Sequence, residues 1–241
     1  MSTAASPILA HFRGVDAQRL LRGSTPGLAA KVDAIKRYQH RRFSLTYADL
    51  LNSDRYRSAA NFFLNELYGP RDFAERDAQF AKVVPAIVRL FPRQVIGTVA
   101  ALAELHELSE RLDTAMGIAL PSIDLSAEVY TRAWQRCGDL AGRQRQIALM
   151  VNLGRSIDGM TRKPLLRKSL RMMRSPARAA GLGQLQGLLE SGFDAFGGMR
   201  GADEFLAIVE SRERSLAIRL FSTELDNLAR VEVDRVWEGL P

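Results

Sequence analysis

The sequence predicts an all-α protein, folded as an irregular orthogonal bundle of about eight helices. Apolar residues recur at intervals of three and four along most of the chain, and no segment alternates apolar and polar residues as a half-buried strand does. Glycine and proline separate these periodic segments. With 241 residues and a hydrophobic content of 46%, the chain can bury one sizeable core, so we expect a single domain over residues 1–241.

Residues 54–92 are expected to form a helical hairpin on which the bundle is built. Large apolar side chains, Phe62 and Phe63 among them, give the first helix more apolar surface than one narrow stripe requires, so several neighbours should bury it. Gly69 should end that helix, because glycine is common just after helix C-termini. Asp72 stands three residues before a glutamate, the spacing of a capping box, so the second helix should begin there.

The same stretch carries a resemblance to a known family. FFLNELYGPRDF at residues 62–73 resembles the signature of the bacterial FFLEELY-motif proteins, and the likeness extends to LRMMRSPA at residues 170–177. Asn65 departs from the family pattern, which has a glutamate at that position. The family has no assigned activity, so the resemblance implies a bacterial helical protein and no particular reaction.

Before the hairpin, one long helix and one short helix are expected. Leu28, Val32 and Ile35 recur at helical spacing and predict a helix over residues 27–42. A short helix should follow and end near residue 52. Residues 1–25 show a helical pattern only around 15–21, so we expect this segment to be peripheral or frayed.

After the hairpin, each expected helix is bounded by a proline, glycine or capping residue. The longest should run from about residue 93 to 120 and end before Pro121, and Ser126 should begin the next. Pro164 suits the first position of a later helix. The predicted ranges are 93–120, 126–138, 140–158, 164–178, 182–197 and 203–222. We expect residues 223–241 to be peripheral or frayed.

The positive charge of the chain is concentrated in one segment. The net charge is +7, but residues 131–178 carry +10, while residues 1–130 carry +2 and residues 179–241 carry −5. Four arginines of the predicted helix over residues 164–178 fall on one stripe beside an apolar stripe, and three further cations widen the positive surface. We call these seven residues the basic face: Arg162, Lys163, Arg167, Lys168, Arg171, Arg174 and Arg178.

Two interpretations of the basic face stay open. Cations on one rigid helix suit an anionic partner, a protein or a nucleic acid. Alternatively, they pair with acids of the C-terminal third, such as Glu204, Glu210 and Glu213, as charges in a folded domain commonly do. No RNA-binding or helix-turn-helix signature accompanies the basic face. A membrane surface is disfavoured, because the neighbouring apolar stripe is narrow and lacks Trp and Phe.

A second hypothesis places a helical pocket for a small apolar or cofactor-like ligand in the signature stretch. Its expected lining residues are Phe62, Phe63, Glu66, Tyr68 and His106. The carboxylate of Glu66 should pair with an arginine nearby in sequence, Arg57, Arg71 or Arg76. Glu110 stands four residues after His106 and should orient its imidazole ring.

Nothing in the sequence predicts a catalytic group, a metal site or a cofactor. None of the three histidines follows a glutamate by three residues, so the ligand pattern of di-iron bundles is absent. No zinc spacing, nucleotide-binding glycine loop or hydrolase nucleophile motif occurs. The lone Cys137 cannot form an internal disulfide, and we expect a half-buried thiol.

The sequence also bears on location. No uncharged run approaches the roughly 20 apolar residues of a membrane-spanning helix, and the N-terminus lacks the apolar centre of a secretory signal. We therefore expect a cytoplasmic protein. The sequence leaves its oligomeric state open, a homo-oligomer included.

Overall fold

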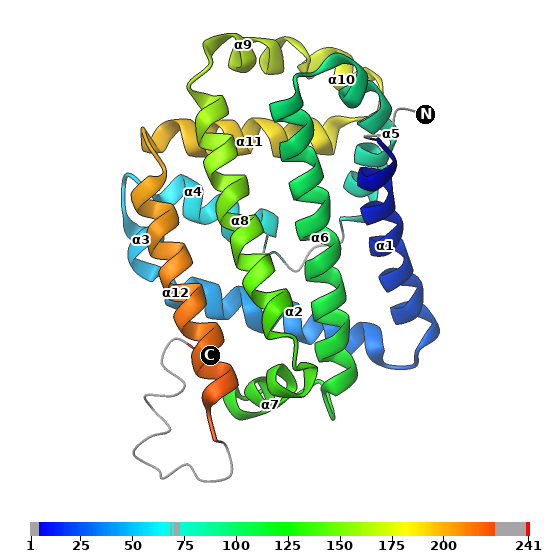
Figure 1. Ribbon diagram of the computed structural model, residues 1–241, viewed down its shortest axis with the longest axis vertical. Helices are drawn as coiled ribbons and strands as arrows, with labels where there is room; N and C mark the ends of the chain where they lie inside the picture. Colours follow the sequence, from blue (N-terminus) through cyan, green and yellow to red (C-terminus); the bar gives the residue numbers. More distant parts are fainter. Residues whose placement is uncertain (1–4, 68, 70–72, 225–239) are drawn as a thin grey trace.

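The predicted all-α fold is confirmed. A computed structural model describes residues 5–67, 69, 73–224 and 240–241, and in these ranges it contains helices and no strand (Figure 1). The twelve α-helices and one π-helix found there exceed the predicted eight or so, because several are short connecting elements. Their bounds are α1 Ala5–Ser24, α2 Leu28–Thr46, α3 Ala48–Asn52, α4 Arg57–Phe62, η1 Phe63–Leu67, α5 Ala74–Leu90, α6 Arg93–Ala119, α7 Ala127–Cys137, α8 Leu140–Thr161, α9 Pro164–Met172, α10 Arg174–Ala179, α11 Gly183–Met199 and α12 Asp203–Ser222.

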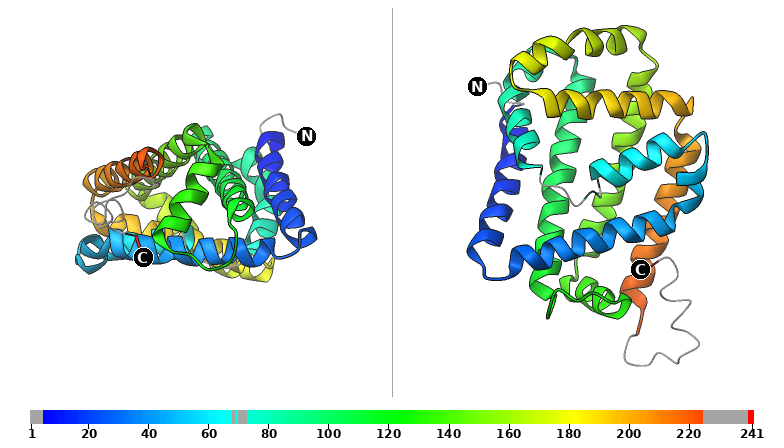
Figure 2. Two further views of the ribbon diagram at one scale, coloured as in Figure 1. Left: turned by 90° about the horizontal axis from the view of Figure 1, so that it is seen from below. Right: turned by 180° about the vertical axis from the view of Figure 1, so that it is seen from behind.

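The frame of the bundle is a row of long helices crossed by two others. Helices α1, α6, α8 and α12 run side by side, and contacts join α1 to α6, α6 to α8, and α8 to α12. Helix α2 crosses this row near one end, and α11 crosses it nearer the other (Figure 1; Figure 2). Helices α9 and α10 lie beyond α11 and form that end of the molecule. This crossing arrangement is the orthogonal bundle that the sequence predicts.

The predicted hairpin at residues 54–92 is replaced by a more open arrangement. Helix α4 continues directly into the π-helical turn η1, and α5 begins at Ala74. Helix α4 packs mainly against α11, whereas α5 packs against α1 and α11, and Figure 1 shows α4 and α5 on opposite sides of the bundle. A Cβ atom at Gly69 would lie 2.2 Å from the carbonyl oxygen of Asn65, so only glycine fits where η1 ends. The capping role predicted for Asp72 lies outside the described residues.

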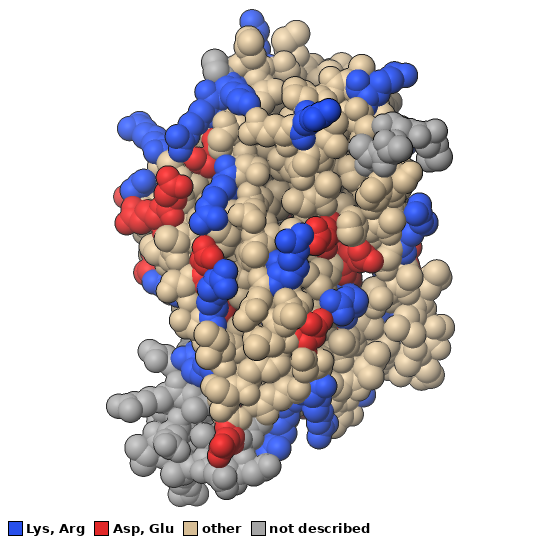
Figure 3. All heavy atoms as spheres, in the orientation of Figure 1, with Lys and Arg blue, Asp and Glu red and all other residues tan. Residues whose placement is uncertain are grey.

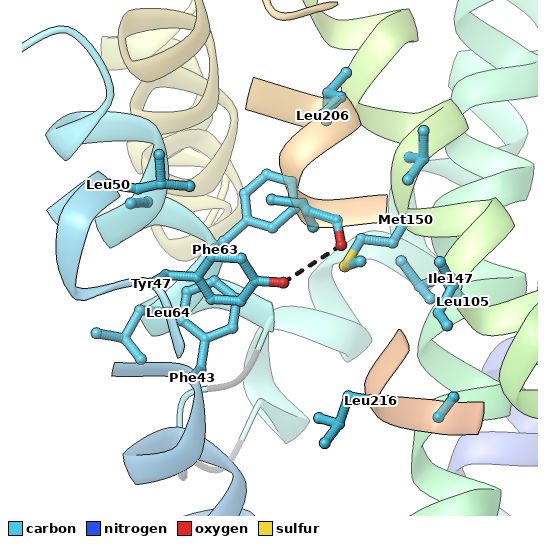
Figure 4. Packing of buried hydrophobic residues seen from close by; sticks show 14 of the residues in the cluster. Phe43, Tyr47, Leu50, Phe63, Leu64, Leu105, Ile147, Met150, Leu206 and Leu216 are labelled. Carbon is cyan, nitrogen blue, oxygen red and sulfur yellow. Dashed lines mark hydrogen bonds between the residues drawn. The ribbon is translucent and has the colours of Figure 1, made fainter. Parts of the chain in front are cut away.

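The main core joins the signature stretch to the C-terminal half of the bundle. Phe63 is fully buried and lies among side chains from α2, α6, α8 and α12, as Figure 4 shows. The hydroxyl of Tyr47 donates a hydrogen bond to the carbonyl oxygen of Val209, 3.4 Å away. The burial predicted for the large apolar side chains around Phe63 is therefore confirmed.

A second cluster of buried residues involves α1, contrary to the expectation of a peripheral or frayed segment at residues 1–25. Residues 5–24 form one continuous helix, and Ile8 and Phe12 on one side of it are buried with Phe80 and Val84 of α5. The rings of Phe12 and Phe80 stack with their centroids 5.8 Å apart. Helix α1 is thus an integral part of the bundle. Most of the segment 223–241 lies outside the described residues.

Two prolines within helical sequence have different effects. Pro85 lies inside α5, and the helix continues past it to Leu90. In contrast, the helix predicted over residues 164–178 is divided at Met173 into α9 and α10. Pro176 accounts for the division, because its ring clashes with the carbonyl group four residues earlier, that of Met172, in a continuous α-helix. Helix α9 ends at that residue.

Candidate functional site

The basic face lies at the end of the bundle that α9 and α10 form. All seven of its residues are exposed. Lys and Arg side chains stand out over this end in Figure 3, separated by uncharged surface. The segment 162–178 contains no acidic residue.

Four arginines of the basic face form ion pairs, three of them with α11. Arg167 lies 2.6 Å and Arg171 3.9 Å from Asp194, and Arg174 lies 2.7 Å from Glu190. Arg162 pairs within its own helix turn with Asp158, at 2.5 Å. The three pairs with Asp194 and Glu190 join α9 and α10 to α11.

Three arginines of the basic face pair with acids of the C-terminal third, as the second interpretation expects, but not with the acids named there. Glu204 bonds Arg55, Glu210 bonds Arg155 and Arg214, and the buried Glu213 bonds Arg42. The predicted pairing of the basic face with these three acids is therefore wrong. Its actual partners are Asp158, Glu190 and Asp194, each nearer in sequence.

Three cations of the basic face have no carboxylate partner within the described part of the chain. Lys163 donates a hydrogen bond of 2.7 Å to the side-chain oxygen of Gln94. No ion pair to a described residue is found for Lys168 or Arg178. The basic face has seven cations, and three carboxylates pair with it. Among these charges the excess is four positive charges at this end of the bundle.

Large apolar side chains are exposed at the same end, a feature that the sequence analysis missed. Leu165 is 76% exposed and Met172 70%, and they flank Lys168 on the outward side of α9. Leu90 and Phe91, at the corner between α5 and α6, are 68% and 46% exposed. The sequence signal was present, because Leu165 and Met172 are seven residues apart and so share one side of a helix. The apolar stripe described for the predicted helix is the inward one, which includes Leu166 and Leu170.

A surface hollow of about 470 Å³ lies beside the exposed Leu165 and reaches the start of α6. Its lining is mostly apolar and comes from the start of α6, the end of α8 and the start of α9. Pro92 and Val95 of the first segment and Leu165 and Leu166 of α9 supply its apolar lining. Arg162 and Lys163, just before α9, supply its positive charges. The corner between α5 and α6 is therefore next to the start of the basic face.

A second hollow, of about 450 Å³, lies on another face of α6 and is lined by charged residues. Its carboxylates are already paired: Glu104 bonds Arg145 and Asp139 bonds Arg111. His11 and Glu107 bond each other across it at 2.5 Å. Because these charges are satisfied internally, the hollow does not select an ion.

The residues of the predicted pocket are distributed over two environments. Phe62 and Phe63 belong to an aromatic cluster, in which the Phe63 ring lies 5.3 Å from that of Phe205 and 6.1 Å from that of Phe196. Neither hollow described above includes a pocket residue. Tyr68 lies outside the described residues. The ligand pocket stays a prediction.

Glu66 and His106 belong to a chain of polar side chains between α1, η1, α5 and α6. Arg76 lies 3.1 Å from Glu66, which confirms one of the three predicted partners, and Arg76 also approaches Asp77 at 3.9 Å. Asp77 in turn bonds Nε2 of His106 at 2.7 Å and accepts a hydrogen bond from Arg19. Burial alone would raise the pKa of Asp77, but the hydrogen bonds and charges of His106 and Arg19 outweigh it, so this pKa is lowered.

The sequence suggested that Glu110 orients His106, and this is wrong. Glu110 holds two cations instead. It accepts hydrogen bonds from Arg22 of α1 and from Lys36 of α2, the latter at 2.6 Å. Burial opposes ionisation, but the charges of Lys36 and Arg22 outweigh it and lower the pKa of Glu110 to about 2. This carboxylate therefore joins three helices, and His106 bonds Asp77 instead.

No three His, Cys, Asp or Glu side chains of the described residues converge as metal ligands. None of the helices in the described ranges combines the length and the apolar character needed to cross a bilayer. Cys137 is half-buried, and burial raises the pKa of its thiol.

Comparison with known proteins gives a family and no activity. No curated protein and no solved structure matches the chain. The family described as "Domain of unknown function (DUF8198)" matches residues 18–227, which span nearly all of the helical bundle. The chain therefore belongs to the DUF8198 family.

Proposed function

We propose that this protein acts by binding, and that the basic face holds an anionic partner. The observation that carries the proposal is the excess of four positive charges at the end of the bundle, on side chains that are all exposed. Charges of one sign gathered on one surface raise the local concentration of oppositely charged partners and speed their association. Exposed cations on a helical surface suit a protein or a nucleic acid that carries negative charge.

The arrangement of the cations supports a rigid binding surface. Asp194 and Glu190 hold three of the arginines against α11, so their guanidinium groups are ordered before a partner arrives. Each guanidinium has five N–H donors, so an arginine in an ion pair can still donate to a second anion. The free cations Lys163, Lys168 and Arg178 add charge without internal compensation.

A charge-reversal experiment tests this function. The triple variant Lys163→Glu, Lys168→Glu, Arg178→Glu leaves the described ion pairs intact and replaces three positive charges by three negative ones. A matched control reverses Arg13, Arg37 and Arg41, which are exposed on α1 and α2. Binding would be measured by fluorescence anisotropy with two labelled polyanions, polyglutamate and a single-stranded oligonucleotide, over a range of salt concentrations.

We expect the unmodified protein to bind at low salt with an affinity that falls as salt rises. The triple variant should bind at least about tenfold more weakly than the control. Equal losses in the two variants would mean that total charge matters and the basic face does not. In that case the proposed function is wrong.

A further inference from the structure

We infer that the anionic partner of the basic face is the surface of a membrane that contains acidic phospholipids; the inference rests on the proposed function above. The interface would consist of the outward side of α9 and the corner between α5 and α6. Four exposed apolar side chains supply the part that enters the lipid: Leu90, Phe91, Leu165 and Met172. The cations around them would contact the headgroups.

The side of α9 that faces solvent has the composition of an interfacial helix. Leu166 and Leu170 are half-buried against the bundle, so the opposite side of the helix points away from it. Lys168 lies on that outward side between Leu165 and Met172, with their 76% and 70% exposure. Apolar side chains with cations beside them bind at the boundary between lipid headgroups and acyl chains.

A second element supplies the aromatic side chain that the α9 sequence lacks. Leu90 is the last residue of α5 and Phe91 follows it, and Pro92 and Val95 next to them line the same hollow as Leu165. The bond between Lys163 and Gln94 also joins the start of α6 to the start of the basic face. The structure therefore puts apolar side chains from two separate segments at one end of the molecule, which the sequence did not reveal.

These apolar side chains favour a membrane over a nucleic acid or an acidic protein segment. A nucleic acid would contact the cations through phosphates and leave Leu165 and Met172 in water, because aromatic side chains and arginines are the usual partners of bases. α9 and α10 are the outermost helices at their end of the bundle, so no neighbouring helix in the described ranges shields that side (Figure 1; Figure 2). A membrane surface is extended, so it can meet α9 and the corner between α5 and α6 at the same end of the molecule.

The hollow beside Leu165 suits one lipid headgroup with the upper part of its chain. Arg162 and Lys163 lie at it and can donate hydrogen bonds to a phosphate. Its lining is otherwise mostly apolar, so it can cover methylene groups. A basic pocket beside an apolar lining is a feature by which proteins hold acidic lipid headgroups.

The experiment is co-sedimentation with vesicles of phosphatidylcholine alone and vesicles of phosphatidylcholine mixed with phosphatidylglycerol. One double variant, Leu165→Ser with Met172→Ser, removes the outward apolar pair and no charge. Its matched control, Leu20→Ser with Ile218→Ser, changes residues that are 74% and 60% exposed on α1 and α12. Binding of each protein to the labelled polyanions is measured in parallel.

We expect the unmodified protein to sediment with the phosphatidylglycerol vesicles and not with phosphatidylcholine alone. The Leu165→Ser, Met172→Ser variant should bind the vesicles at least about tenfold more weakly than its control, while its affinity for polyanions is unchanged. The Lys163→Glu, Lys168→Glu, Arg178→Glu variant should bind both the vesicles and the polyanions more weakly. For the vesicles, we expect its affinity to fall by roughly fivefold or more for each cation replaced.

The remaining outcomes separate the two proposals. If both serine variants bind vesicles equally, or if only polyanions are bound, the membrane inference is wrong and the proposed function stands, with a nucleic acid or an acidic protein as the partner. If neither vesicles nor polyanions are bound at low salt, both proposals are wrong.

Discussion

Asp77 of α5 accepts a hydrogen bond from Nε2 of His106 of α6 at a distance of 2.7 Å, and both side chains are largely buried. The same carboxylate accepts a hydrogen bond from Arg19 of α1, so it joins three helices. A carboxylate that orients a histidine is common in active sites, but the remaining partners here, Arg76 and Glu66, are also engaged in ion pairs. The chain of contacts therefore satisfies itself, and its evident effect is on stability.

Replacement of Asp77 by asparagine should destabilise the protein more than replacement of His106 by glutamine. Asp77→Asn leaves the half-buried Arg19 paired only with the exposed Asp16 and should cost about 2–3 kcal/mol. His106→Gln removes one hydrogen bond and should cost about 1–2 kcal/mol. Urea unfolding followed by circular dichroism measures both, and equal costs would show that Arg19 gains nothing from Asp77.

The stability of the protein should fall at acid pH through Glu110. Its pKa is about 2 in the folded protein against 4.5 for an unperturbed glutamate. A lowered pKa stabilises the fold above the unfolded value, and this contribution, about 3 kcal/mol, is lost as the pH falls from 4.5 to 2. In Glu110→Gln this part of the pH dependence should be absent.

At neutral pH Glu110→Gln should lower the free energy of unfolding by about 3–5 kcal/mol, because Arg22 and Lys36 stay buried without a carboxylate. Glu104→Gln is the control on the same helix. Glu104 pairs with the exposed Arg145, so its loss should cost less than about 1 kcal/mol. Similar costs for the two variants would contradict the role assigned to Glu110.

Gly69 and Gly97 should respond in opposite directions to alanine. Gly69→Ala brings a methyl group against the backbone of Asn65 and should destabilise by at least about 2 kcal/mol. Gly97 lies inside α6 with open space around it, so Gly97→Ala should stabilise by about 0.5–1 kcal/mol. Thermal unfolding of the two variants checks both signs, and a neutral Gly69→Ala would mean that the end of η1 adapts.

Gly154 of α8 allows close contact with α12, and a double-mutant cycle can measure this. A Cβ atom at Gly154 would lie 2.5 Å from a methyl carbon of Leu206, which is fully buried and has little room to move. Gly154→Ala should therefore cost about 1–3 kcal/mol. In a Leu206→Ala background the cost should largely disappear, and additive costs would show that the two positions do not interact.

Much of the secondary structure could be predicted from the sequence, because its signals are local. Ser126 caps α7 by accepting a hydrogen bond from the amide of Val129, as the capping preference indicates. Helix α1 was underestimated even though Ile8, Phe12 and Val15, all buried, recur at helical spacing. The prediction of the hairpin is wrong for a different reason. Helix α11 comes about 100 residues later in the chain and packs against both α4 and α5, so the sequence of the hairpin itself does not reveal it.

The candidate site was predicted in part. The basic face could be found from charge alone, and all its residues are exposed. Their partners could not be found, because the sequence does not specify which of several acids a helix meets; Asp194 and Glu190 lie on the one helix that supports α9 and α10. Phe91 belongs to the candidate site only because the corner between α5 and α6 lies next to the start of α9. This proximity follows from tertiary packing, so no local sequence pattern indicates it.

The division of one predicted helix at Met173 has a consequence for local unfolding. In the described chain α9 has no fully buried side chain and α10 has only Ala177, so ion pairs with α11 hold these two helices in place to an unusual degree. Screening of those pairs by salt should let α9 and α10 detach while the aromatic core stays folded. Their amide protons should then exchange with solvent sooner than those of any long helix in the bundle, and the difference should widen as ionic strength rises.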